Sequence, residues 1–507
     1  MGLVIDLIPE GASPKEPSFT GMLAARDPWQ LDSPLFDWAR GDSFTLRHAL
    51  EAVAIFGEIG SAKTTGSAAW IIRKYLELGM GGLVCCVKPG DRELIESYAK
   101  LTGRSDSLII VSPKNRWHCN FLKYALNCPG AVGSRVEQIV SLLMTIAEAA
   151  ERAERSSAQG DKFWTQSLRE LLRNAVEICV AARSEVTMTL LDGVINSAPR
   201  SPEEVHSEEW QRNSLCYQLI EEAEKRDLSF RQQADFELAA RYFLRKIPDM
   251  PHDTRGSIFA TYGVMADALR RGHMADLFDS DTTFVPELTF EGAIIVLDLP
   301  IKVYGQAGMY VQSAFTYLWQ LACEQRDVNK NPRPVFLFID EFHELISNHT
   351  SEFLATARNA RVASVLITQN KPNYLAAMGG EAGRHRVDAC LANTGTKIFH
   401  ANGDPETNKW ASDMISEEVE FRMNYHASRD GNGPNGGGSE SVGRKVLPSV
   451  FTQLKKGGPQ NDFWTEAIIF RTGESFSNNK GEPWLRTKFK QLIPGVTTKD
   501  AKGGRSK

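Results

Sequence analysis

The stretch Gly57-Glu-Ile-Gly-Ser-Ala-Lys63-Thr64-Thr65 decides the fold of this chain, because small residues there join an apolar run to a helical pattern. The preceding run, Ala52-Val-Ala-Ile-Phe56, predicts a buried strand, and the apolar pattern resumes at Ala68-Ala-Trp-Ile-Ile72. A strand, a tight loop and a helix start are the context in which a phosphate-binding loop works. Backbone N–H groups and the positive end of the helix receive phosphates there. The stretch therefore predicts a nucleotide site on an α/β fold.

Single positions in this stretch have predicted roles. Lys63 is expected to reach the β- and γ-phosphates, and the Thr64 hydroxyl to ligate Mg²⁺. The residues predicted to bind the nucleotide are Gly57, Gly60, Ser61, Ala62, Lys63, Thr64 and Thr65. Ala62 stands where such loops usually have glycine. If that position needs a positive φ, alanine costs about 1–2 kcal/mol, whereas a rearranged loop removes most of the cost.

A second segment, Pro334-Val-Phe-Leu-Phe-Ile-Asp340-Glu341, predicts a buried strand that ends on two carboxylates. Asp340 is expected to hold the metal through water, and Glu341 to orient and deprotonate the attacking water. The alternative is that both are only the solvated end of a strand. Together with the phosphate loop, the paired carboxylates predict an ATPase that uses ATP and Mg²⁺.

A third strand, Val362-Ala-Ser-Val-Leu-Ile-Thr368, is followed by Gln369. The carboxyl ends of such strands face the ligand crevice, so Gln369 is predicted to contact the γ-phosphate or the lytic water. Its alternative role is to cap the strand. Arg358 and Arg361 precede this strand, and arginine suits the charge of a transferring phosphoryl group, often from an adjacent subunit. Both arginines are equally compatible with a solvated surface.

Composition limits the possible partners and compartments. The 507 residues suggest two or three domains, and the net charge of −5 means that any nucleic-acid contact must come from a local patch. Basic clusters occur at Arg241/Arg245/Lys246, at Arg270-Arg271 and near the C-terminus, although such runs are usually solvated faces. The eight cysteines include no Cys-x-x-Cys pair, which is typical of a reducing cytosol. No run approaches the length of a membrane span, so we expect a soluble, cytoplasmic protein.

The pattern of apolar residues predicts a mainly parallel α/β sheet with an all-helical insertion. The expected segments are an irregular N-terminal arm (1–48), an ATPase domain in two parts (49–130 and 286–495), an all-α insertion (131–285) and a basic flexible tail (496–507). Two details belong to the second part of the ATPase domain. The Gly/Asn-rich stretch Asp430–Ser439 is expected to be a flexible loop or a disordered excursion, and a strand near Ala467–Phe470 is expected to close the sheet edge.

The order of these motifs resembles the FtsK/HerA superfamily of ring ATPases. The polar strand Asn393-Thr-Gly-Thr-Lys-Ile398 and the helix start Asp404-Pro-Glu-Thr407 continue the series. The segment that begins at Thr254-Arg-Gly-Ser-Ile258 and leads into Ile294–Pro300 resembles one group in particular, the TraD/TraG-like coupling proteins of type IV secretion and conjugation. The resemblance covers roughly residues 50 to 475.

The resemblance implies a RecA-like P-loop fold, a homohexameric ring with nucleotide sites between subunits, and a central channel for DNA. Lys63 and Thr64 match the loop lysine and hydroxyl of the family, Asp340 and Glu341 its metal and catalytic carboxylates, and Gln369 its sensor glutamine.

Arg358 falls where the group has its candidate arginine finger. Two features depart from the group's pattern. Coupling proteins begin with transmembrane helices, which this sequence does not show, and Lys88-Pro-Gly-Asp91 replaces an Asp-Pro-Lys-Gly-Glu pattern, so no role is predicted for it.

The expected function is an ATP-driven ring that binds and translocates DNA, with a separate effector or relaxase-type protein as a possible partner. One alternative is a soluble ATPase subunit of a mobile-element or anti-phage defence complex that acts with a separate effector. Another is a nucleotide-gated protein scaffold with slow hydrolysis, for which Ala62 is the motivating feature. A small-molecule P-loop kinase is disfavoured by the chain length and by the lack of an obvious lid segment.

Overall fold

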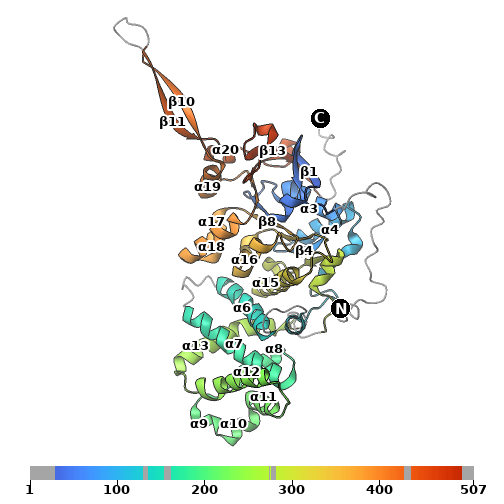
Figure 1. The fold of residues 1–507 in the computed structure, drawn as a ribbon, viewed down its shortest axis with the longest axis vertical. Helices are drawn as coiled ribbons and strands as arrows, with labels where there is room; N and C mark the ends of the chain where they lie inside the picture. Colours follow the sequence, from blue (N-terminus) through green and yellow to red (C-terminus); the bar gives the residue numbers. More distant parts are fainter. Residues whose placement is uncertain are drawn as a thin grey trace.

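A large twisted sheet forms the centre of the molecule (Figure 1). The computed structural model describes residues 29–128, 135–153, 162–272, 275, 281–426 and 435–493. Within these residues nine strands form one sheet in the order β13-β12-β9-β3-β8-β7-β4-β6-β5. Every neighbouring pair from β9 to β5 is parallel, whereas β12 is antiparallel to both β9 and β13. The strands are β3 (Val53–Phe56), β4 (Gly81–Cys85), β5 (Leu108–Val111), β6 (Ile294–Leu297), β7 (Val335–Ile339), β8 (Val362–Thr368), β9 (Thr396–His400), β12 (Trp464–Arg471) and β13 (Trp484–Lys490).

The parallel strands are apolar throughout because helices cover both faces of the sheet. In β7, Phe336 and Phe338 join the core beneath one helical layer, while Leu337 and Ile339 join the core beneath the other. The first layer contains α2 (Leu46–Leu50), α3 (Ala69–Glu77) and α4 (Asp91–Leu101). The second contains α15 (Ile301–Gln325), α16 (Asn348–Thr356), α17 (Lys371–Met378), α18 (Gly380–Ala392) and α19 (Pro405–Ile415). The expected α/β fold with a mainly parallel sheet is confirmed.

A helical segment lies between β5 and β6 in sequence and forms the lower part of the molecule in Figure 1. The described part of this segment contains no strand, in agreement with the helical periods of the sequence. After α5 (Phe121–Asn127), α6 packs against α15 and so joins the segment to the sheet layer. The helices are α6 (Arg135–Ala153), α7 (Lys162–Arg183), α8 (Met188–Asn196), α9 (Pro202–Val205), α10 (Glu208–Asn213), α11 (Leu215–Glu224), α12 (Phe230–Arg241) and α13 (His252–Leu269).

The expected sheet edge is wrong, because β13 and not β12 is the outermost strand on that side. β12 contains the predicted run Ala467–Phe470 and lies between β9 and β13. The sequence of β13 alternates, with Leu485 and Phe489 buried and the intervening positions polar. An edge strand that buries one face lacks the continuous apolar run by which the inner strands are identified.

Two hairpins include residues that were expected to be irregular. β1 (Pro34–Ala39) pairs with β2 (Asp42–Thr45), so the expected irregular arm is wrong for these residues, while residues 1–28 lie outside the described part. β10 (Glu417–His426) pairs with β11 (Asn435–Arg444) and projects from the body beside α19 and α20 (Pro448–Thr452) (Figure 1). The expected loop at Asp430–Ser439 is therefore wrong for 435–439, because backbone pairing does not need apolar side chains. Residues 430–434 and the expected tail 496–507 lie outside the described residues.

Among the described residues, no helix combines the length and the apolar character that crossing a bilayer requires.

Candidate functional site

The phosphate loop lies at the carboxyl end of β3 and is tied to the two neighbouring strands. The Gly57 N–H donates to the Gln369 carbonyl at 3.1 Å, and the Glu58 N–H donates to the Ala401 carbonyl at 2.9 Å. The chain then turns through Gly60, at φ 78°, into a π-helical turn, η1 (Thr64–Ala68), that leads into α3. The strand, loop and helix start expected from the sequence are therefore present.

Ala62 adopts a φ of 63°, which answers the question that the sequence leaves open. An alanine in the left-handed region costs about 1–2 kcal/mol, so the departure from glycine carries a conformational cost here. The Ala62 methyl lies against Gly457, where an added Cβ would be only 2.7 Å from it. The loop before β12 thus leaves room for a side chain at position 62.

A series of buried hydrogen bonds joins the phosphate loop to β9 and β12. The His400 ring, at the end of β9, is hydrogen-bonded through Nε2 with Ser67 Oγ at 2.7 Å and through Nδ1 with Thr465 Oγ1 at 3.2 Å. The Thr465 hydroxyl donates to the Ser61 carbonyl at 2.8 Å. Burial, helped by the nearby Lys63 ammonium, lowers the pKa of His400 to about 3, so the ring is neutral. The sequence motifs give no signal for His400 or Thr465, which reach the loop only through the strand order.

Asp340 and Glu341 follow β7 directly and lie beside the start of the helix. The Thr64 hydroxyl donates to Asp340 Oδ2 at 2.9 Å, and the Glu341 N–H donates to Asp340 Oδ1 at 2.9 Å. Both carboxylates are buried, with 3% and 4% of the residue exposed, so the alternative of a solvated strand end is wrong. The Thr64 hydroxyl and the Asp340 carboxylate are hard oxygen ligands of the kind that Mg²⁺ takes beside nucleotide phosphates, so this pair could hold the metal.

Gln369 connects the Glu341 carboxylate to the phosphate loop. Its side-chain Nε2 donates to Glu341 Oε1 at 3.2 Å, while its backbone carbonyl accepts from the Gly57 N–H and from Asn402 Nδ2, the latter at 2.9 Å. The side chain of Glu341 is therefore linked to the backbone of the phosphate loop through two hydrogen bonds, both made by Gln369. The geometry fits a residue that responds to the occupant of the site.

Two lysines give the site its positive charge. Lys63 is buried, and burial lowers its pKa although Asp340 and Glu341 oppose the shift. Lys88, for which the sequence predicts no role, pairs through Nζ with Glu341 Oε1 and lies 3.5 Å from Asp340 Oδ2. Asp91 lies in the same turn, where burial and the nearby Asp340 raise its pKa to about 7.

Arg358 is not brought to this site. It follows α16, and its Nη1 lies 3.2 Å from Oε1 of Glu51, which precedes β3. Glu51 is thus at the amino end of the strand whose carboxyl end carries the phosphate loop. The Arg358 side chain is 53% exposed, whereas Arg361 donates to the Pro332 carbonyl at 2.7 Å. The structure brings together residues 57–65, Asp340, Glu341 and Gln369 of this chain, and leaves both arginines apart from them.

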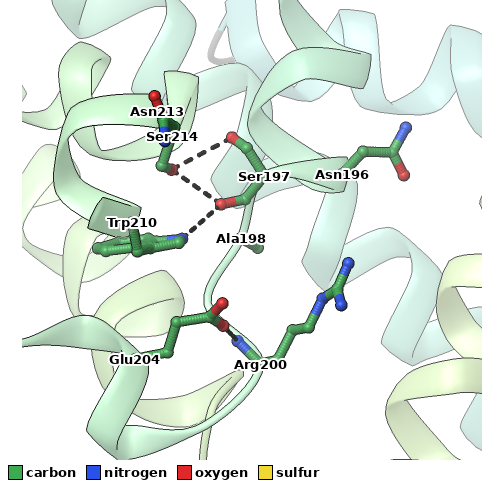
Figure 2. Close-up of a pocket in the computed structure, with 8 residues that line it drawn as sticks. All are labelled: Asn196, Ser197, Ala198, Arg200, Glu204, Trp210, Asn213 and Ser214. Carbon is green, nitrogen blue, oxygen red and sulfur yellow. Dashed lines mark hydrogen bonds between the residues drawn. The ribbon is translucent and has the colours of Figure 1, made fainter. Parts of the chain in front are cut away.

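A separate cavity of about 270 Å³ lies in the helical segment (Figure 2). Trp210 Nε1 donates to the Ser197 carbonyl at 2.9 Å, and the Ser214 hydroxyl donates to the same carbonyl at 2.8 Å. These bonds hold the end of α8 against α10 and the start of α11. The lining residues are Asn196, Ser197, Ala198, Arg200, Glu204, Trp210, Asn213 and Ser214, and none is a predicted site residue.

Comparison with known proteins agrees with this architecture. Residues 334–452, from β7 to α20, match the family model described as the TraM recognition site of TraD and TraG. No curated protein has a significant sequence match to the chain. Among solved structures, the plasmid coupling protein TrwB with the non-hydrolysable GTP analogue GDPNP has a TM-score of 0.58 at 14% identity, with 92% of each chain covered.

Two further TrwB structures give the same result. TrwB with ADP and Mg²⁺ has a TM-score of 0.55 at 14% identity, covering 93% of this chain and 92% of that one. TrwB with the ATP analogue ADPNP has a TM-score of 0.56 at 14% identity, with 90% of each chain covered. The chain therefore has the fold of the TrwB coupling protein and matches the TraD and TraG family model over residues 334–452, which confirms the resemblance that its motifs indicate.

Proposed function

We propose that this protein is an ATPase that hydrolyses ATP to move DNA as a ring, in the manner expected of a coupling protein. The proposal rests on one observation: the phosphate loop, the Thr64–Asp340 pair and the Glu341–Gln369 pair meet at the carboxyl ends of the parallel strands. TrwB structures contain ADP with Mg²⁺ or analogues of ATP and GTP, which supports nucleotide and Mg²⁺ binding at the corresponding strand ends here.

The proposed chemistry divides among these residues. The loop N–H groups and Lys63 bind the phosphates, and Thr64 with Asp340 holds Mg²⁺. Bound Mg²⁺ neutralises charge on the phosphate oxygens. Glu341 orients a water molecule in line with the γ-phosphate and accepts its proton. Gln369 transmits a change at Glu341 to the loop, because it bonds to both.

In the proposed ring, each nucleotide site receives an arginine from the neighbouring subunit. Arg358 pairs with Glu51 at the amino end of β3, whereas its own phosphate loop follows the carboxyl end of that strand. Arg358 could therefore reach only the nucleotide of a neighbouring subunit. Arg471, which is buried, also pairs with Glu51 at 3.0 Å and so fixes the carboxylate that holds Arg358. An arginine supplied in trans stabilises charge on the transferring phosphoryl group. The sequence resemblance suggests a hexamer for this assembly.

DNA as the substrate rests on the resemblance and on local charge. Two of the basic clusters are partly neutralised, since Lys246 pairs with Glu170 at 2.5 Å and Arg270 pairs with Asp192 at 2.5 Å. Because the whole chain has a net charge of −5, DNA contact must come from local basic residues. Pairing of such residues with phosphates releases counterions, so DNA binding should weaken steeply with salt. A protein partner is proposed for residues 334–452, where the family model describes a recognition site.

A nucleotide-gated scaffold with slow hydrolysis is the second candidate, and the left-handed conformation of Ala62 favours it. Displacement of a triplex-forming strand from duplex DNA separates the two candidates. The motor should displace the strand with ATP and fail to do so as Glu341→Gln. Tight ATP binding without displacement by the wild-type protein would contradict the motor and support the scaffold. A motor that serves a mobile element or a defence complex would give the same result in the strand-displacement test. Identification of its effector would distinguish that alternative.

A further inference from the structure

Lys88 occupies a fixed position at the carboxyl end of β4, next to the strand that carries the catalytic carboxylates. Its N–H donates to Asp91 Oδ2 at 2.9 Å across the turn Lys88-Pro-Gly-Asp91, and Gly90 adopts a φ of 96°. Proline in the turn restricts the backbone further, and α4 begins directly at Asp91. The backbone of Lys88 is therefore held firmly, so its side chain extends toward Glu341 from a defined point.

The two oxygens of the Glu341 carboxylate have different surroundings. Oε1 accepts from the Lys88 ammonium and from Gln369 Nε2, the latter at 3.2 Å. Oε2 is buried and has no hydrogen-bond partner among the described residues. The His343 ring lies near Oε2, but its Nδ1 is 3.6 Å away and is already bonded with Thr368 Oγ1 at 3.0 Å. Oε2 is thus the oxygen with a free lone pair.

We propose that Lys88 is a positioning residue that, with Gln369, fixes Glu341 Oε1 and leaves Oε2, the oxygen without a donor, to accept the proton of the attacking water. The inference rests on the proposed role of Glu341. In the step, the water oxygen bonds to the γ-phosphorus and the bond to the bridging oxygen breaks, with its electron pair leaving on ADP. The water proton goes to Oε2. Two donors on one oxygen stop the carboxylate from rotating, and misplacing a catalytic group by about 1 Å can cost about 100-fold in rate.

The first test separates positioning from phosphate binding. Lys88→Met should lower kcat about 10- to 100-fold while KM for ATP stays within about threefold of the wild-type value. Lys88→Arg should recover part of the loss, because a guanidinium also donates to Oε1. Lys100→Met is the matched control, since Lys100 is an exposed lysine on α4, and it should behave as wild type. A raised KM with unchanged kcat would overturn the proposal, as would Lys88→Met activity equal to wild type.

The second test asks whether Lys88 acts through Glu341. In the Glu341→Gln background, adding Lys88→Met should cause no further loss in single-turnover hydrolysis, whereas independent roles would make the losses multiply. Binding of a non-hydrolysable ATP analogue should be alike in all variants and shows that each one folds. A wild-type protein without ATP hydrolysis would overturn both the proposed function and this inference. Hydrolysis by the wild type with multiplicative losses would overturn only the role of Lys88.

Discussion

Gly57→Ala should distort the phosphate loop, because position 57 has no room for a side chain. A Cβ there would lie 2.5 Å from Ser61 Oγ and 2.8 Å from His400 Cβ. The serine hydroxyl can rotate away, but Ser61 Cβ would remain 3.3 Å from the new methyl group. His400 cannot retreat, since its ring is bonded on both sides and its Cβ belongs to β9. The loop must therefore move away from β9.

The cost follows from this geometry. An extra methyl group in a packed site costs about 1–3 kcal/mol. Alanine also restricts the unfolded chain, which returns about 0.4–1 kcal/mol, so a net loss of about 1–2 kcal/mol remains. The displaced loop N–H groups should weaken nucleotide binding by a similar free energy, or about tenfold. Urea unfolding and a fluorescence titration with a labelled ATP analogue measure the two effects.

Gly256→Ala is the matched control for this substitution. Gly256 lies on α13, and a Cβ added there would meet nothing within 4 Å. The control should gain about 0.5–1 kcal/mol from helix propensity and bind nucleotide as the wild type does. If Gly57→Ala unfolds at the wild-type urea concentration and binds the analogue equally well, the loop does not pack on His400 as described.

Three further predictions follow from the same site. Glu341→Gln should keep nucleotide affinity but lower single-turnover hydrolysis at least 100-fold; equal activity would contradict its role as base. Arg358→Ala should be inactive alone but regain activity when mixed with Glu341→Gln, because some interfaces then hold both intact residues; no recovery would contradict action in trans. His400→Gln should make the free energy of unfolding depend less on pH below pH 6.5. Burial lowers the pKa of His400 from 6.5 to about 3, so only the unfolded chain gains the proton. Between pH 6.5 and 5 the wild type should lose about 2 kcal/mol more than His400→Gln in urea unfolding, and parallel profiles would contradict a buried neutral ring.

The inner strands could be predicted because both of their faces are buried. β7 and β8 consist largely of apolar residues, and the carboxyl ends of parallel strands meet at one edge. For that reason Lys63, Thr64, Asp340 and Glu341 could be expected to converge, although 276 residues separate Thr64 from Asp340.

The other contacts of the site join residues that are far apart in sequence, so no local sequence pattern predicts them. His400 and Thr465 support the loop only because β12 inserts antiparallel beside β9, and that strand order is not encoded near either residue. Lys88 reaches Glu341 because β4 neighbours β7, whereas its own segment departs from the family pattern. Arg358 has a role at a nucleotide site only in the proposed ring, where it would act on a neighbour's nucleotide. The hairpin β10–β11 was missed because its second strand is rich in glycine and polar residues.

Steady-state ATP hydrolysis by the purified protein, with and without single- or double-stranded DNA, tests the central claim most directly. We expect DNA to stimulate hydrolysis, the stimulation to disappear at high salt, and Glu341→Gln to abolish it. The DNA form that stimulates would identify the track of the motor. Hydrolysis that is indifferent to DNA, or absent although ATP binds, would contradict the translocase and support the nucleotide-gated scaffold.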